Sequence, residues 1–370
     1  MTQGGRLRVL ATVAAALILS GCAPAKGTAT PEPTATATAT LTPTASPSPE
    51  PTASPTAAPT APTAFSALDG MPADPSLVSR LPIAVMIDDN AVARPQSGFN
   101  AASIVYQAPA DGGEDRYMLV FQERDATDIG PVRSGRPYFV YWASEYSAGF
   151  AHYGGDEKTR FKVIPAIDGK LMYNLDALAG SPGAFHRIST RTAPHNAYTS
   201  TADLYRVAAS HAYPVTMVAG LVNRPFQDDA PAALRPKSGS ISIPYGRGVT
   251  SYSYDNATNS YLRSVAGKAQ LDAMDGQRVV ARDVVVLFMA LSIDPQSERG
   301  HARPVLAQIG TGTAWVFRDG HVIKGKWAKK DAGALTQLYD AAGKEIPLVR
   351  GRIFFQVVPT GTKVTYDAAP

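Results

Sequence analysis

Cysteine is almost absent from this chain of 370 residues, in which Cys22 is the only one. A disulfide within the chain is therefore excluded, and the folded part must be stabilised by its core alone. Charged residues make up 18% of the sequence, the formal net charge is +4, and no dense tract of lysine or arginine occurs. Because nucleic-acid binding relies on such tracts, we expect no nucleic-acid partner.

The common motifs of catalysis and cofactor binding are also missing. The sequence has no G-x-S-x-G, no S-x-x-K in its globular part, no Walker A loop and no G-x-G-x-x-G. Its six histidines show neither H-x-H nor H-x-x-x-H spacing, so a zinc site would have to combine histidines that are distant in sequence. We therefore predict no cofactor and no metal.

The region around Cys22 predicts how the chain is exported and anchored. Arg6 and Arg8 precede an apolar stretch from Val9 to Leu19, which is too short for a mature membrane span and is typical of a secretory signal. It ends in Leu19-Ser20-Gly21-Cys22, which resembles the lipobox of bacterial lipoproteins, where the cysteine is diacylated and the signal is cut before it. We expect residues 1–21 to be a signal peptide and Cys22 to hold the protein at the outer face of the cytoplasmic membrane by its diacylglyceryl group. An ordinary cleaved signal peptide is the alternative.

The next segment, residues 22–64, has the composition of a disordered tether. After Cys22 it consists almost entirely of Thr, Ala, Pro and Ser, and Lys26, Glu32 and Glu50 are its only charged residues. So few apolar side chains cannot offset the entropy of ordering the segment. Its prolines favour an extended polyproline II conformation of about 3.1 Å per residue. We expect it to hold a folded region away from the membrane; a spacer of no fixed role is the alternative.

From about residue 65 the composition becomes globular, and the remaining length predicts two domains. Residues 65–234 are predicted to form an α/β domain, because buried strands at 82–88, 103–108 and 117–121 are followed by helices at 138–146 and 200–210. Residues 235–370 alternate apolar and polar side chains between turn residues, which predicts a mainly antiparallel β domain. A longer apolar run at 283–293 is predicted to be one buried strand. The fold class is therefore mixed α and β.

Arginines beside glycine, proline and histidine stand out at the predicted strand ends of the first domain. Loops at strand ends often build ligand sites, and the planar guanidinium suits carboxylate or phosphate. The candidate ligand-binding residues are Arg94, Arg116, Arg133, Ser134, Arg136, His152, Arg191, His195 and Asn196. The candidates for acid–base chemistry are His152, His195, Asp111 and Asp156. The alternative is that the arginines form structural ion pairs with Asp88, Asp89, Asp111 and Glu145.

Ordered segments over most of residues 80–360 resemble one family. They include Ala84-Val-Met-Ile-Asp88, Arg94-Pro-Gln-Ser-Gly98, Gly130-Pro-Val-Arg-Ser134, Ala193-Pro-His-Asn196 and Tyr252-x-Tyr-Asp255. In these segments the chain resembles the YerB-like lipoproteins. The resemblance implies a two-part architecture behind a lipoprotein signal and implies no activity, since the family is defined as a domain of unknown function. Asp111 stands where relatives commonly carry glutamate and Asp156 where they carry serine, which puts a fixed catalytic role of residue 156 in doubt.

Three functions are compatible with these features. The leading one is a surface-anchored binding protein that holds an anionic or saccharide envelope ligand in the arginine-rich cleft. The second is an envelope-polymer hydrolase or transferase that uses His152 or His195 as base with Asp111 or Asp156 as partner. The third is a scaffold for envelope proteins with Tyr138, Tyr141 and Trp142 in an interface, although their helical spacing also fits core packing.

Overall fold

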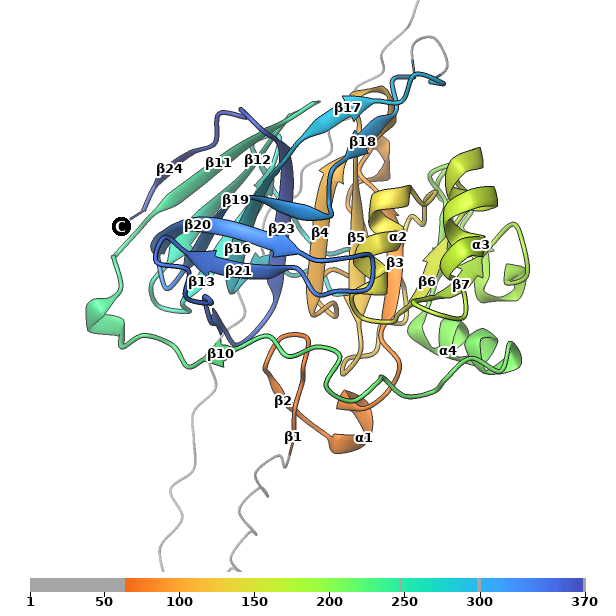
Figure 1. Ribbon diagram of the computed structural model, residues 1–370, viewed down its shortest axis with the longest axis horizontal. Helices are drawn as coiled ribbons and strands as arrows, with labels where there is room; N and C mark the ends of the chain where they lie inside the picture. Colours follow the sequence, from red (N-terminus) through yellow and green to blue (C-terminus); the bar gives the residue numbers. More distant parts are fainter. Residues whose placement is uncertain (1–63, 247, 298–300, 369–370) are drawn as a thin grey trace, which may run out of the picture. The chain divides into compact units, whose positions relative to one another are not determined.

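A computed structural model describes residues 64–246, 248–297 and 301–368 (Figure 1). The predicted signal peptide, the lipidation site Cys22 and residues 22–63 of the predicted tether lie outside the described residues. The described chain has a mixed, β-rich fold built around one large sheet that contains both parallel and antiparallel strand pairs. The predicted mixed class is therefore correct at that level.

The large sheet has ten strands. Their order across the sheet is β21 (Gln337–Asp340), β20 (His321–Lys329), β19 (Gly310–Arg318), β16 (Asp283–Met289), β23 (Ile353–Pro359), β4 (Ile104–Pro109), β5 (Asp115–Phe121), β3 (Ile83–Asp88), β6 (Gly149–His152) and β7 (Tyr173–Asp176). The pairs β16–β23, β23–β4, β3–β6 and β6–β7 are parallel, and the others are antiparallel.

A second sheet is antiparallel throughout. Its strands are β14 (Lys268–Ala269), β13 (Ser260–Val265), β12 (Gly248–Asp255), β11 (Ser240–Tyr245) and β24 (Thr365–Asp367), with β15 (Val280–Ala281) also paired to β13. Four small two-stranded sheets pair β1 (Ala64–Phe65) with β2 (Pro72–Ala73), β8 (Phe185–Arg187) with β9 (Ala197–Thr199), β10 (Phe226–Gln227) with β22 (Leu348–Val349), and β17 (Leu291–Ile293) with β18 (Pro304–Leu306).

The described helices are short, and most of them fall in the N-terminal half. The α-helices are α1 (Pro75–Val78), α2 (Pro137–Ser144), α3 (Ile164–Ile167) and α4 (Thr201–Ser210). Single 3-10 turns are η1 (Ala91–Ala93), η2 (Asp111–Gly113), η4 (Pro182–Ala184) and η5 (Ala232–Leu234), and η3 (Thr159–Val163) is a π turn.

The large sheet buries both of its faces. In β16, Val284 and Val286 belong to the core cluster that also contains residues of the second sheet and of α4, whereas Val285 and Leu287 belong to the cluster on the other face, which contains residues of α2. Successive side chains of a strand point to opposite faces, so a strand covered on both sides needs apolar residues at every position. This explains the unbroken apolar runs in the sequence, including the predicted strand at Ile83–Asp88.

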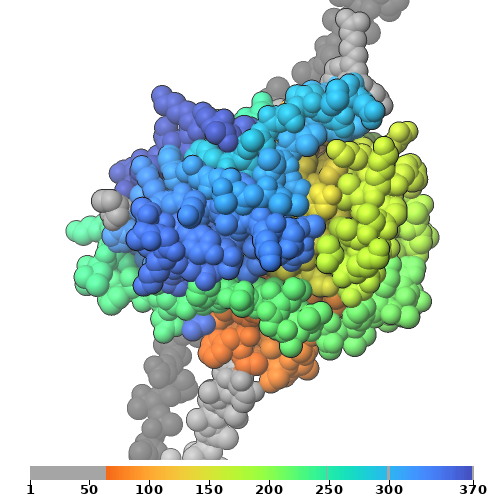
Figure 2. Space-filling model, in the orientation of Figure 1, coloured from red at the N-terminus to blue at the C-terminus, as the bar shows by residue number. Residues whose placement is uncertain are grey.

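The two predicted domains, 65–234 and 235–370, both contribute strands to this large sheet. Strands of both halves share it, and they meet where β23 pairs in parallel with β4. A fully buried ion pair also crosses the boundary, because Lys329 Nζ lies 3.0 Å from Glu145 Oε1. The described residues belong to one compact unit with a continuous surface, in which C-terminal residues (blue) lie against N-terminal ones (yellow to green; Figure 2). Residue 235 marks a change of strand pattern within that unit.

Most predicted elements occur close to their predicted bounds. Helix α4 begins as expected, since the Ser200 side chain accepts a hydrogen bond from the Asp203 N–H at 3.1 Å. The apolar run 283–293, predicted to be one strand, is interrupted at Ala290: its first part is β16, and its second part, β17, joins β18 in a separate ribbon. The prediction missed this break because apolar character continues through it.

Candidate functional site: an arginine-lined pocket

A cavity of about 420 Å³ opens where β3 ends and β5 begins, close to the first turn of α2. It combines a set of charged side chains that are far apart in the sequence. The cavity is lined by Asn90, Asp111, Gly112, Glu114, Arg116, Arg133, Ser134, Arg136, His195 and His301. Six of the sequence-predicted residues therefore lie together: Asp111, Arg116, Arg133, Ser134, Arg136 and His195.

The register of β3 and β5 creates the polar end of this sheet face. Arg116 lies opposite Asp88 in the antiparallel pair, so both side chains project from the same face. Two residues further along the strands, Met86 and Met118 pack on that face in the core beside α2. Along this strand pair, the side chains on this face thus change from apolar to charged at the point where α2 no longer covers the sheet.

Residues 130–136 bring three more lining groups to the strand end. The Arg133 N–H donates to the Met86 carbonyl at 2.9 Å, so this segment lies alongside β3. Close approach requires glycine at position 130, because a Cβ there would come within 2.6 Å of the Tyr198 ring. The backbone of this segment therefore fixes the position from which the Arg133 side chain extends into the cavity.

Arg116 is a buried cation whose charged neighbours include Arg133 and Arg136. Its Nη1 donates to the Ser134 carbonyl at 2.8 Å, its exposed fraction is 6%, and it forms no ion pair within the described part of the chain. Burial, together with the positive charges of Arg136 and Arg133, lowers the pKa of Arg116 to about 9. The guanidinium is still charged at neutral pH, and an anion in the cavity would stabilise it.

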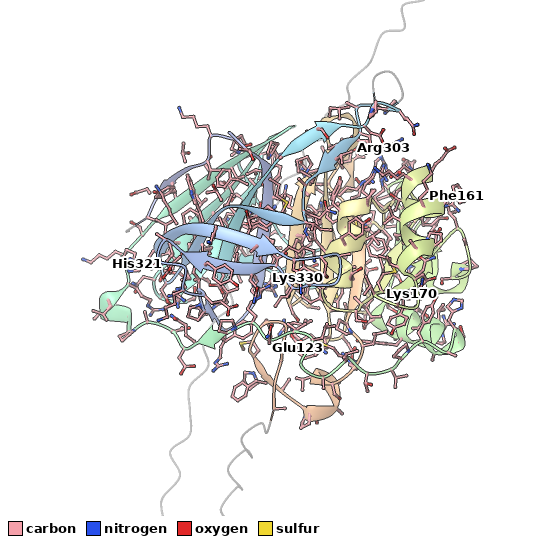
Figure 3. All side chains as sticks on the ribbon, viewed as in Figure 1. Glu123, Phe161, Lys170, Arg303, His321 and Lys330 are labelled. Atoms are coloured by element: carbon pink, nitrogen blue, oxygen red, sulfur yellow. The ribbon has the colours of Figure 1, made fainter. Side chains whose placement is uncertain are left out.

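Arg136 and Asp111 form a bidentate ion pair at the wall of the cavity. Arg136 donates from Nε to Asp111 Oδ1 at 2.8 Å and from Nη2 to Oδ2 at 2.6 Å. Burial alone would raise the pKa of Asp111, but the hydrogen bonds and charge of Arg136 hold it below its usual value. Arg303, beside β18 in Figure 3, adds a second cation 3.8 Å from Asp111. A carboxylate held in this way is poorly suited to exchange protons, so the predicted acid–base role of Asp111 is not favoured.

His195 enters the cavity with a carboxylate behind it. Its Nδ1 lies 2.6 Å from Asp88 Oδ2, and Arg133 Nε lies 3.3 Å from the same oxygen. The predicted partner of His195 was Asp111 or Asp156, and the structure places Asp88 there instead. Asn196 stabilises the loop that carries His195, because its Nδ2 donates to the carbonyls of Ile188 and Arg191 at 3.1 Å each.

Two predicted acid–base residues lie outside the cavity lining. His152 is fully buried, with Nδ1 2.7 Å from the Gly154 carbonyl and Nε2 2.8 Å from Asn174 Oδ1. Asp156 accepts hydrogen bonds from the Thr159 N–H at 3.0 Å and its hydroxyl at 2.6 Å. Both side chains have structural partners, so their roles in substrate chemistry are not favoured.

The two remaining predicted arginines hold the loop that follows β3. Arg94 pairs with Asp89 through Nε at 3.1 Å and Nη2 at 2.7 Å. Arg191 donates to the carbonyls of Pro95, at 2.6 Å, and Ala93. For these two arginines the structural alternative is the better description.

The interface expected of the scaffold hypothesis is largely inside the protein. Tyr138 and Trp142 are buried, and the Trp142 ring stacks on Tyr106 with centroids 5.1 Å apart. Tyr141 is half-buried. The aromatic spacing of α2 is therefore explained by core packing.

Comparison with known proteins places this site in a family. Residues 68–214 match the model described as "Protein of unknown function (DUF3048) N-terminal domain", and residues 241–355 match the C-terminal domain of the same family. The chain belongs to the DUF3048 family. It is 29% identical over 296 residues to a protein of Bacillus subtilis (strain 168) named "Putative lipoprotein YerB", a match that covers 79% of this chain and 85% of that protein. The crystal structure of YerB from Bacillus subtilis shares the fold, with a TM-score of 0.71, 24% identity and coverage of 82% of this chain and 100% of that one.

Within the DUF3048 fold, sequence reasoning missed several lining residues. Asn90 and Glu114 lie next to predicted strand ends, and the Asn90 Nδ2 donates to Glu114 Oε1 at 2.7 Å. From the sequence, Asp88 is predicted only as a structural partner of arginines, although its position at the end of a buried strand also indicates a place near a ligand site. His301 comes from the C-terminal half, and no local pattern linked it to this site.

Among the described residues, no helix is long and apolar enough to cross a membrane. The same described residues contain no group of three or more His, Cys, Asp or Glu side chains arranged to hold a metal ion. The lining of the DUF3048 pocket holds three arginines and two carboxylates, and guanidinium groups suit an anionic ligand.

Proposed function

We propose that this DUF3048 protein is an extracytoplasmic, lipid-anchored protein that binds an anionic or acidic-saccharide ligand of the cell envelope in the arginine-lined pocket. The observation that carries the proposal is Arg116, a buried guanidinium that faces two other arginines and forms no ion pair among the described residues. Burying a cation without a counter-ion is unfavourable, and a protein retains such a group most readily where a ligand supplies the charge.

The pocket has the means to orient such an anion. Arg116, Arg133 and Arg136 converge on the cavity from two segments of backbone that are fixed by strand pairing. Guanidinium groups bind phosphate or carboxylate through paired hydrogen bonds, which gives geometry as well as charge. The volume of about 420 Å³ suits a sugar or phosphate unit of a larger polymer, with the rest of the polymer outside.

The proposed location rests on Cys22 and on the name of the relative. The lipobox-like run predicts diacylation of the cysteine, and the Bacillus subtilis relative is named a putative lipoprotein. Labelling of cells with radioactive palmitate checks this: the full chain should take up label, and Cys22→Ser should not. Label retained in Cys22→Ser would show that Cys22 is not the lipidation site.

Isothermal titration of the full chain in non-ionic detergent tests the ligand. The probes are inorganic phosphate, glycerol phosphate oligomers, muropeptides and nucleotides. We expect binding of at least one phosphate or acidic probe, lost in Arg116→Met and in Arg133→Ala. Arg206→Ala removes an exposed arginine of α4 and should leave binding unchanged. No binding of any probe, or binding that survives both pocket substitutions, would refute the proposal.

A second function is favoured by one specific contact. The His195–Asp88 pair resembles the base and orienting carboxylate of many hydrolases, and His195 Nε2 forms no hydrogen bond within the described residues. In an envelope-polymer hydrolase or transferase, His195 would take a proton from water or a sugar hydroxyl. Incubation with purified wall polymer distinguishes this function: turnover should disappear in His195→Ala and fall in Asp88→Asn, whereas a binding protein gives no turnover in any variant.

A further inference from the structure

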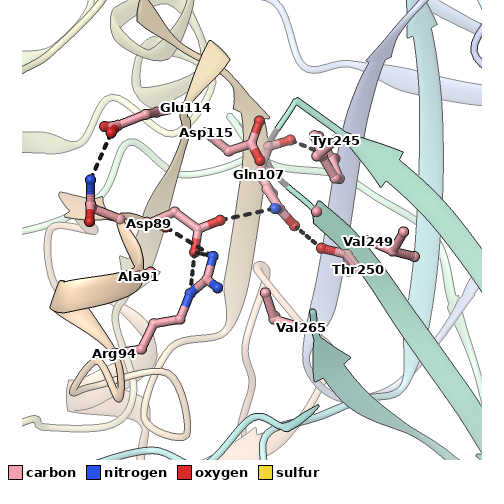
Figure 4. Close-up of a pocket in the computed structure, with 12 residues that line it drawn as sticks. Asp89, Ala91, Arg94, Gln107, Glu114, Asp115, Tyr245, Val249, Thr250 and Val265 are labelled. Carbon is pink, nitrogen blue, oxygen red and sulfur yellow. Dashed lines mark hydrogen bonds and ion pairs between the residues drawn. The ribbon is translucent and has the colours of Figure 1, made fainter. Parts of the chain in front are cut away.

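A second, smaller pocket adjoins the arginine-lined one. Its volume is about 90 Å³, room for a group of a few heavy atoms (Figure 4). Asn90 and Glu114, joined by their 2.7 Å hydrogen bond, line both pockets and form the partition between them. Other lining residues are Asp89, Ala91, Arg94, Gln107, Asp115, Tyr245, Gly248, Val249, Thr250 and Val265.

Asp115 is the unusual group in this small pocket. It precedes Arg116 on β5, so the alternation of the strand directs the two side chains to opposite faces. Asp115 is 8% exposed, and its Oδ1 is buried without any hydrogen bond in the described structure. An unfilled acceptor of this kind costs about 1–3 kcal/mol. A ligand that donates a hydrogen bond there would recover that energy.

The other polar groups of the small pocket are already engaged. Asp89 accepts from Arg94 and, through Oδ2, from Gln107 Nε2 at 3.2 Å. Thr250 Oγ1 donates to Gln107 Oε1 at 3.2 Å, and the Tyr245 hydroxyl donates to the Gln107 carbonyl at 3.4 Å. The hydroxyl oxygens of Thr250 and Tyr245 still have acceptor capacity. The pocket therefore offers acceptors and has few donors to spare.

The charges that face Asp115 come from several elements. Asp89 and Glu114 are acidic neighbours, and Arg94 and Arg263 are the cations, while Tyr245 packs from β11. Burial first, and then the negative charge of Asp89, raise the pKa of Asp115 well above its usual range. Burial therefore favours the neutral form of this carboxyl, and a cation beside Asp115 would favour its ionised form.

We propose that the small pocket binds the ammonium group of the same ligand whose anionic group occupies the arginine-lined pocket, so that the ligand class is an aminoalkyl phosphate. This inference rests on the proposed function for its anionic half. The ammonium donates to Asp115 Oδ1, and the apolar side chains of Ala91, Val249 and Val265 contact the methylene groups that connect it to the phosphate. In its ionised form, Asp115 makes an ion pair with the ammonium.

Matched probe pairs test the ammonium subsite in the full chain. Phosphoethanolamine, 3-aminopropyl phosphate and 4-aminobutyl phosphate are compared by titration calorimetry with ethyl, propyl and butyl phosphate. At one chain length or more, the amine should improve the dissociation constant about tenfold or more, the range of a charge-assisted hydrogen bond that satisfies a buried acceptor. Titrations in buffers of different ionisation enthalpy should show more proton release with the amine than with the alkyl phosphate, because the ion pair favours the ionised form of Asp115.

Two variants remove the subsite in different ways. Asp115→Asn keeps the shape but cannot ionise, and Val249→Trp fills the pocket from an exposed position, so the test survives if one variant fails to fold. Both should lose the advantage of the amine and keep alkyl phosphate binding. Asp228→Asn, at an exposed carboxylate, is the matched control and should retain the advantage.

The outcomes separate this inference from the proposed function. Alkyl phosphates that bind as tightly as their amines at every length would overturn the ammonium subsite and leave anion binding intact. An amine advantage that persists in both pocket variants would also overturn it. If no phosphate probe binds, with or without an amine, both proposals fail together.

Discussion

Replacement of Arg116 by methionine should stabilise the empty protein while it abolishes anion binding. The folded protein lowers the pKa of Arg116 from its usual high value to about 9, a difference that corresponds to about 5 kcal/mol against the charged form at about 1.36 kcal/mol per pKa unit. The substitution also removes the hydrogen bond to the Ser134 carbonyl, which costs about 1.5–3 kcal/mol for a charged donor. The net expectation is a gain of about 2 kcal/mol in the free energy of unfolding.

The sign of the pH dependence provides a second check on Arg116. Because the folded pKa of this base is depressed, the charge penalty is fully present below about pH 9 and disappears as the pH rises toward the higher pKa of arginine in the unfolded chain. The advantage of Arg116→Met over the unmodified protein should therefore shrink between pH 8 and about pH 10. Urea titrations followed by circular dichroism at both pH values measure it. A loss of stability of about 1 kcal/mol or more at neutral pH would show that Arg116 is a structural cation, and the reasoning for the anion site would be wrong.

Three further predictions concern the fold that supports the site. Glu145→Gln leaves the buried ammonium of Lys329 unpaired and should reduce the free energy of unfolding by about 3–5 kcal/mol. The double variant Glu145→Gln with Lys329→Met should recover most of this loss. Urea titration measures both variants, and a single variant with unchanged stability would contradict the role of the pair. Gly130→Ala should cost about 1–3 kcal/mol because of the Tyr198 ring, whereas Gly183→Ala, which meets nothing within 4 Å, should be close to neutral, and equal effects would be inconsistent with this explanation. Tryptophan fluorescence and far-ultraviolet circular dichroism should report one coincident unfolding transition for the two halves, and two separate transitions would support two independently folding domains.

Local patterns in the sequence predicted local structure well. The unbroken apolar run at Ile83–Asp88 and the cap at Ser200 depend on neighbouring residues, and both occur as predicted. The parallel pairing of β23 with β4 joins residues about 250 positions apart, and nothing in either strand specifies the partner. The sequence therefore could not predict that the two halves share one sheet.

The candidate site shows the same division between local and distant information. Arg116, Arg133 and Arg136 were predicted because each follows or precedes a strand, and they do line one cavity. The partner of His195 could not be predicted, because Asp88 meets it only through the register of β3 and the path of a distant loop. Asp115 was not predicted to line a site of its own, because it projects from the face of β5 opposite to that of Arg116.

The position of β23 has a consequence for the order in which the protein can assemble. It is the last of the ten strands along the chain, yet it fills the gap between β16 and β4 near the middle of the sheet. Before β23 arrives, both neighbours are open edges with unpaired backbone groups. The chain must therefore be available as far as Pro359 before the two halves of the sheet can be joined. Until then, the N-terminal half has an exposed strand edge that can pair with other chains.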